Sequence, residues 1–223
     1  MSLPFWSQAG EIARADLRSE SRTGEVMAVT IPFGAVALLL IPFGIGTDAP
    51  LLRQIGVGIY WAVVLLFGML VALRRSAAEG PAQRDLLGLL GVDPAARFAG
   101  RALSTGVLVL AFEVVLGPIA IALYDARITG WAWLILVVPM VAAGLALLST
   151  LIGSIVGGSG AAPALVPFLV APLAIPMLLA ATQSLEGLRL GESILAWLLL
   201  LAAMDLVLAI AGVLTARPLQ EVR

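Results

Sequence analysis

Two acidic residues, Glu113 and Asp205, stand inside long apolar stretches of this 223-residue chain. If those stretches lie in a bilayer, each ionised carboxylate would cost roughly 2.5–3.5 kcal/mol, so each must be protonated, paired or in contact with water. Paired carboxylates can perform acid–base chemistry, but no nucleophile or metal site accompanies them here. The two acids either serve function directly or hold helices together, and both interpretations stay open.

The residue inventory excludes most other chemistry. The chain has no Cys, no His and no Lys, so all thirteen basic residues are Arg. A thiolate zinc site, an imidazole base and a Walker A lysine are therefore absent. We predict no catalytic residue, no metal and no cofactor on this chain, and any ATP must bind a separate subunit. The net charge of −1 gives no basis for nucleic-acid binding.

The composition is that of an integral membrane protein. Hydrophobic residues make up 61% of the chain, charged residues 12%, and the mean hydropathy is +1.08, whereas soluble domains carry about 25% charged residues. We predict an all-α fold, one transmembrane domain over residues 1–223, with six helices of bilayer-spanning length. The predicted spans are residues 26–46, 55–73, 102–124, 131–156, 161–182 and 194–216.

The arginines predict the orientation of these spans. Ten of the thirteen fall in the first, third, fifth and seventh segments outside the spans, and only Arg53, Arg127 and Arg189 fall in the other three. Cytoplasmic loops are enriched in basic residues. We therefore expect both termini and the long loop over residues 74–101 to lie in the cytoplasm.

Residues 1–25 have the pattern of an amphipathic helix lying on the inner membrane face. On a helical wheel the apolar residues fall within one arc, and charged residues occupy the other side. The apolar arc contains Phe5, Trp6, Ala9, Ile12, Ala13 and Leu17. Asp16 and Glu20 intrude on its apolar side.

The 74–101 loop contains a short leucine-bearing helix after Gly80-Pro81, ending at Gly91. Exposed leucines are costly in water, so we expect this helix to dock onto a partner. Asp93-Pro94 then has the pattern of an N-cap followed by proline at the first helical position. It predicts a helix that runs through Arg97 and Arg101 into the third span.

The fifth predicted span contains four prolines, each of which removes a helical hydrogen bond. These are Pro163, Pro167, Pro172 and Pro176. Carbonyls freed in lipid need partners from neighbouring helices or water, so we expect a kinked or broken segment with a mechanical or path-lining role. We place Tyr60 and Trp61 at the outer mouth of the second span.

Several stretches resemble a known family. Residues 41–46 (Ile-Pro-Phe-Gly-Ile-Gly), 51–55 (Leu-Leu-Arg-Gln-Ile), 58–62 (Gly-Ile-Tyr-Trp-Ala) and 173–179 follow its first outer loop, second span and proline-rich fifth span. The order of elements resembles permeases of the ABC-2 type of ABC exporter. From about Arg14 to Arg217 the chain is similar to the heme exporter protein B family of the cytochrome c maturation system. Residues 79–87 depart from the family's usual Asp-Gly-Ser-Leu-Glu-Gln-Leu loop.

The resemblance implies a permease of a bacterial inner membrane that handles heme and is driven by a separate ABC ATPase. The ATPase would grip the loop helix through Gln83, Arg84, Asp85, Leu86, Leu87 and Leu90. It further implies a homodimer in membrane lipid, with a heme-handling membrane protein and a heme chaperone as partners. With no His or Cys, this chain lacks the usual axial heme ligands, so a partner would ligate the heme.

Two alternatives compete with this interpretation. The first is an ABC-2-type exporter of a lipid, a drug or a polysaccharide. The second is an intramembrane enzyme or a proton-coupled carrier that uses Glu113 and Asp205.

Overall fold

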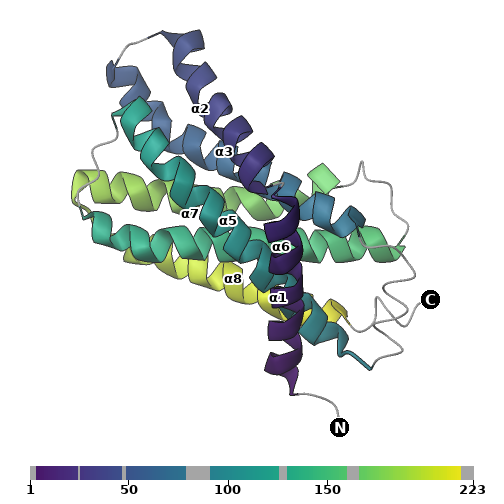
Figure 1. The fold of residues 1–223 in the computed structure, drawn as a ribbon. Coiled ribbons are helices and arrows are strands. Elements are labelled where there is room, and N and C mark those ends of the chain that lie inside the picture. Colours follow the sequence, from purple (N-terminus) through teal and green to yellow (C-terminus); the bar gives the residue numbers. More distant parts are fainter. Residues whose placement is uncertain are drawn as a thin grey trace.

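The computed structural model of the protein describes residues 4–24, 26–46, 49–78, 91–125, 130–159 and 166–216. Every regular element in these residues is a helix or a helical turn (Figure 1). In chain order they are α1 (Phe5–Thr23), the π-helical turn η1 (Val26–Thr30), α2 (Ile31–Ile45), α3 (Ala49–Ala78), α5 (Pro94–Tyr124), the 3₁₀ turn η2 (Trp131–Trp133), α6 (Leu134–Ser159), α7 (Val166–Leu190) and α8 (Leu195–Ala216). The all-α expectation is confirmed for these residues.

Five helical stretches in the described residues are long and apolar enough to cross a membrane. They are Ala28–Ile45, Ala49–Val71, Pro94–Tyr124, Leu134–Ile155 and Leu195–Ala216. Each overlaps one of the six spans predicted from the sequence. The remaining predicted span, residues 161–182, lies partly outside the described residues, and its described part belongs to α7. A total of six spans therefore stays a prediction.

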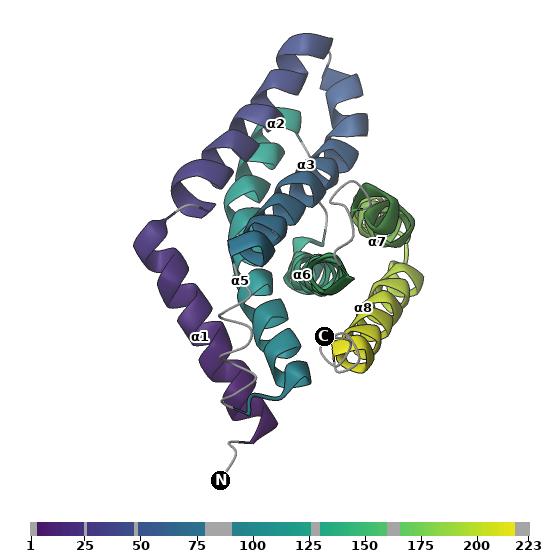
Figure 2. The same cartoon turned by 90° about the vertical axis from the view of Figure 1, so that its right-hand side faces the viewer.

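Helix α6 is the centre of the bundle. It contacts α3, α5, α7 and α8, and Figure 2 shows it end-on with α5 on one side and α8 on the other. Helix α2 lies outside this group against α3 and α5. The main buried cluster contains residues from α2, α3, α5, α6, α7 and α8, so one core joins all of these helices.

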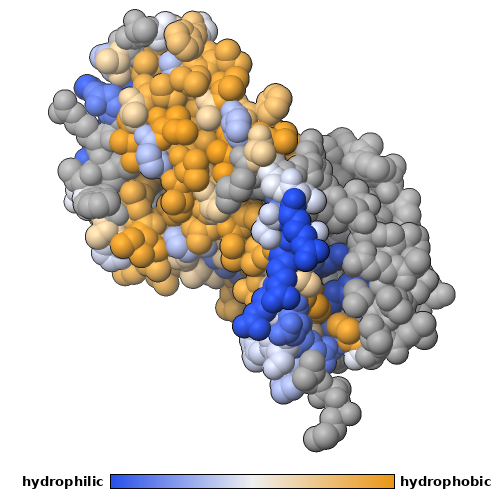
Figure 3. Space-filling model, viewed as in Figure 1, coloured by the Kyte–Doolittle hydropathy of each residue, from blue (hydrophilic) through white to orange (hydrophobic). Residues whose placement is uncertain are grey.

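Helix α1 runs across the bundle rather than along it. In Figure 1 its axis is roughly perpendicular to α6, α7 and α8. It ends at Gly24, whose φ of 64° is the left-handed conformation that favours glycine. The polar residues of α1 form the blue stripe in Figure 3, beside the orange apolar surface of the bundle. This arrangement fits the expected interfacial helix, whose place in a membrane stays a prediction.

The start of α5 confirms the predicted capping signal. The Asp93 side chain accepts a hydrogen bond from the Ala95 amide at 3.0 Å, and Pro94 occupies the first helical position. The helix then continues without interruption through Arg97 and Arg101 to Tyr124. This local motif provides a hydrogen-bond acceptor for one free amide of the first turn.

Candidate functional site

Glu113 lies on α5 in the interior of the bundle. Its side chain is 1% exposed, and neither carboxylate oxygen has a hydrogen-bond partner among the described residues. The nearest polar group with a defined contact is Tyr60 on α3, whose hydroxyl donates to the main-chain oxygen of Glu113 at 3.0 Å. A buried acceptor left unsatisfied costs about 1–3 kcal/mol. Burying the Glu113 carboxyl at the α3–α5 contact therefore lowers the free energy of unfolding.

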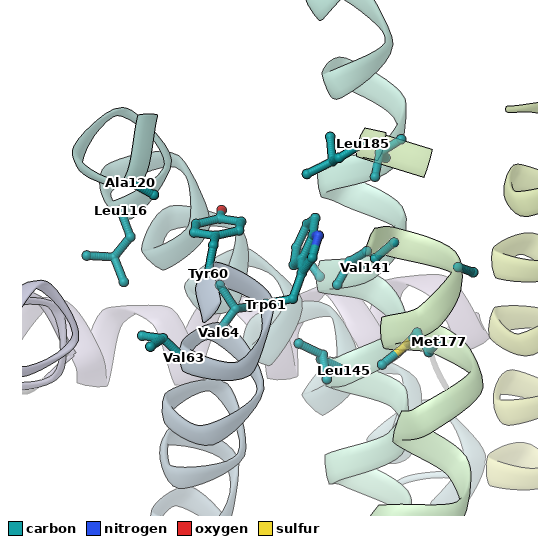
Figure 4. Packing of buried hydrophobic residues seen from close by; sticks show 14 of the residues in the cluster. Tyr60, Trp61, Val63, Val64, Leu116, Ala120, Val141, Leu145, Met177 and Leu185 are labelled. Atoms are coloured by element: carbon teal, nitrogen blue, oxygen red, sulfur yellow. The ribbon is translucent and has the colours of Figure 1, made fainter. Parts of the chain in front are cut away.

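Tyr60 and Trp61 of α3 are buried inside the helical bundle. They are 7% and 1% exposed, their rings meet edge to face at 4.8 Å, and Figure 4 shows them packed among residues of α5, α6 and α7. Helix α3 begins at Ala49, six residues before the predicted span, so both rings lie about three turns inside it, and their place at an outer mouth stays a prediction. The Trp61 indole N–H is also buried without a hydrogen-bond acceptor in the described residues.

Asp205 is the eleventh of the 22 residues of α8 and is half-buried. Its Oδ1 is buried and has no hydrogen-bond partner in the part of the chain that the structure describes. A Cβ placed on Gly144 of α6 would lie 2.5 Å from this oxygen. Gly144 thus lets the carboxylate of Asp205 lie close to the α6 backbone. The two acids therefore occupy different environments.

The proline residues are only partly described. Pro163 lies outside the described residues, and the side chain of Pro167 is likewise not described. Pro172 and Pro176 are inside α7, which is a single helix from Val166 to Leu190. The segment is therefore not broken over these residues, whereas a role in transport stays a prediction.

The predicted ATPase-coupling residues all lie outside the described part of the chain: Gln83, Arg84, Asp85, Leu86, Leu87 and Leu90. The elements on either side of them are described. Helix α3 ends at Ala78 and α5 begins at Pro94, so this segment joins the two helices.

A joint between α1 and α5 follows directly after that segment. Ala9 is fully buried, and a Cβ placed on Gly100 of α5 would lie 2.6 Å from the Ala9 carbonyl oxygen. The Ser104 hydroxyl donates to the Asp16 carboxylate at 2.9 Å. By sequence, Asp16 interrupts the apolar side of α1. In the structure it forms a polar contact between α1 and α5.

Hydrogen bonds and an ion pair also join elements at the opposite end of the bundle. Arg53 of α3 donates through Nε to the carboxylate of Asp125 at 2.7 Å and forms an ion pair with it. One residue earlier, the Tyr124 hydroxyl donates to the carbonyl of Leu38 on α2 at 2.9 Å. Two of the three arginines predicted to lie outside are thus paired with acids, since Arg189 also pairs with Glu186. No local pattern predicts the Arg53–Asp125 contact, because the two residues are 72 positions apart.

A comparison with protein families found a match over almost the whole chain. The family described as CcmB protein matches residues 7–220, nearly the whole length. No curated protein matches the chain.

Proposed function

The chain belongs to the CcmB protein family, and we propose that it is the membrane-spanning permease of an ATP-driven transporter whose ATPase is a separate subunit. Family membership makes it a heme-export membrane subunit of cytochrome c maturation, with several passes through the inner membrane. The match over residues 7–220 carries this conclusion. It favours heme handling over the export of a lipid, a drug or a polysaccharide.

Coupling to the ATPase would take place through the segment between α3 and α5. Helix α5 continues from that segment without a break, and its first turns are tied to α1 by the Ser104–Asp16 hydrogen bond and the close approach at Gly100. Force applied between Ala78 and Pro94 would reach the interior of the membrane through one rigid 31-residue helix. This continuity supports the coupling role of Leu86, Leu87 and Leu90.

The proposed orientation puts α1 and both termini on the cytoplasmic side. The distribution of the arginines supports it, because ten of the thirteen fall in the segments proposed to be cytoplasmic. Helix α7 packs along α6 and α8, which supports it as the sixth span. We keep the ABC-2-type assignment as part of this proposal.

The proposed assembly is a homodimer with an ATPase, a heme-handling membrane protein and a heme chaperone. Axial ligation of heme would be provided by a partner, since no His or Cys is present in the chain. This subunit would transmit motion to the site where a partner handles heme.

We propose that Glu113 takes part in the transport cycle. A state in which the α3–α5 contact shifts would give its carboxyl a partner, and recovering the cost of an unsatisfied group would favour that state. The same residue is the strongest point in favour of a proton-coupled carrier. Transport by this chain without an ATPase would support the carrier, and strict dependence on ATP would exclude it.

Pull-down of the ATPase tests the coupling proposal. Leu86→Asp and Leu87→Asp each place a charge on the docking helix and should abolish co-purification of the ATPase from detergent-solubilised membranes. Leu86→Met and Leu87→Met are the matched controls, because they keep an apolar side chain of similar size at the same positions, and they should retain the ATPase. Full retention by both Asp variants would refute the assignment, as would equal loss in the Met controls.

A further inference from the structure

One face of the bundle exposes the central helix. Three residues one turn apart on α6, Leu136, Pro139 and Ala143, are exposed although the helix contacts four others. Ala143 lies on the α6 surface between Gly144, which meets Asp205 of α8, and Ala146, which lies 3.6 Å from a Cβ placed on Gly106 of α5. The stripe is therefore bordered by α5 and α8, which flank α6 in Figure 2.

The two flanking helices also carry exposed apolar residues. Val107 of α5 is 50% exposed, and Leu206 of α8 is 60% exposed. Ala202, one turn before Leu206, is exposed too. We call the surface formed by Val107, Ala143, Ala202 and their exposed neighbours the α5–α6–α8 face.

Asp205 is the one acidic side chain on this face among the described residues. It is only half-buried, and its position in α8 places it about 15 Å from either helix end, at the middle of a hydrocarbon core about 30 Å thick. Lipid offers neither a hydrogen bond nor a counter-charge to a carboxylate at this depth. An apolar face alone would fit lipid, but Asp205 does not.

The chain itself supplies no counter-charge. All thirteen arginines lie outside the six predicted spans, and there is no Lys or His. A second copy of this chain would therefore also bring no basic side chain to the middle of the membrane. Because a second copy would leave Asp205 without a counter-charge, charge complementarity favours another polypeptide as the occupant.

We propose that the α5–α6–α8 face is the docking site for a transmembrane helix of another subunit, which places a basic side chain against Asp205. Ala143 and Ala202 are exposed and small enough to let the two backbones approach closely, as helix contacts in membranes require. The proposal does not depend on which substrate the permease moves.

The absence of cysteine in the chain makes a direct test simple. Single cysteines at Val107 and at Ala202 carry a photo-crosslinker, and the irradiated native membranes containing the whole complex are analysed by mass and peptide sequencing. Val36 on α2 is the matched control, because it is 49% exposed on a different face. We expect an adduct with a different polypeptide from Val107 and Ala202, within a transmembrane segment that contains Arg, Lys or His, and not from Val36.

Substitution of Asp205 makes the test specific. Asp205→Asn should reduce the adduct at least tenfold, Asp205→Glu should retain it, and replacing the partner's basic residue by Leu should reduce it equally. Gel filtration in detergent verifies that each variant is folded. Adducts with lipid only, adducts only with a second copy of this chain, or an undiminished adduct in Asp205→Asn would each overturn the proposal.

Discussion

Replacing Glu113 by Leu should make the folded protein more stable while impairing its function. The carboxyl is 1% exposed and neither oxygen has a partner in the described residues. An unsatisfied buried group costs about 1–3 kcal/mol, and an apolar side chain of similar size removes that cost. For a domain of this size each kcal/mol corresponds to about 2–4 °C, so the melting temperature should rise by roughly 2–12 °C.

The assay compares thermal unfolding of the purified variants in one detergent. Glu113→Gln keeps a polar group of the same shape and should stay within about 1 kcal/mol of the parent protein. Leu116 provides the reverse control, because it is fully buried one turn further along α5. Leu116→Gln should lose at least the roughly 1–3 kcal/mol that Glu113→Leu gains.

The same variants separate stability from function. If Glu113 works in the cycle, the Leu variant should be stable yet form less covalently bound heme in its host, as expected where activity depends on a destabilising residue. A melting temperature that falls in Glu113→Leu would refute the reasoning, because it would mean that the carboxyl has a stabilising partner in the folded state. Full activity in a stabilised variant would reduce Glu113 to a packing residue.

Three further substitutions have defined outcomes. Gly100→Val should release α1 from α5, because its Cβ would lie 2.6 Å from the Ala9 carbonyl oxygen, and limited proteolysis at the arginines of α1 should become faster; an unchanged cleavage rate would contradict the joint. Tyr124→Phe should lose about 0.5–1.5 kcal/mol of unfolding free energy through one hydrogen bond to a carbonyl of α2, and a melting curve that matches the parent would show that this bond is not needed. Changing Pro172 and Pro176 together to Ala should slow transport more than it lowers stability, and unchanged turnover would end the mechanical interpretation of α7.

Local signals in the sequence predicted the elements that depend on local physics. Asp93-Pro94 predicted the start of α5 because capping involves only adjacent residues. Hydropathy located the five spans for the same reason, since transfer into a bilayer acts on each segment separately.

Contacts between distant residues could not be predicted in this way. Hydropathy places Arg53 in a loop, yet it lies in the first turns of α3 and pairs with Asp125, 72 positions further along the chain. By sequence, Asp16 interrupts the apolar face of α1, and only the fold shows that Ser104 of α5 donates a hydrogen bond to it. Glu113 and Asp205 are equivalent by sequence, and only the fold shows that one is fully enclosed and the other lies beside an exposed face.

Deletion of the gene in its own host tests the central claim most directly, with covalently bound heme in c-type cytochromes detected by peroxidase staining of gels. The account predicts that every stained band is lost. The intact gene and a Leu86→Met copy should restore them, and a Leu86→Asp copy should not. Normal bands in the deletion strain would contradict a role of this permease in cytochrome c maturation.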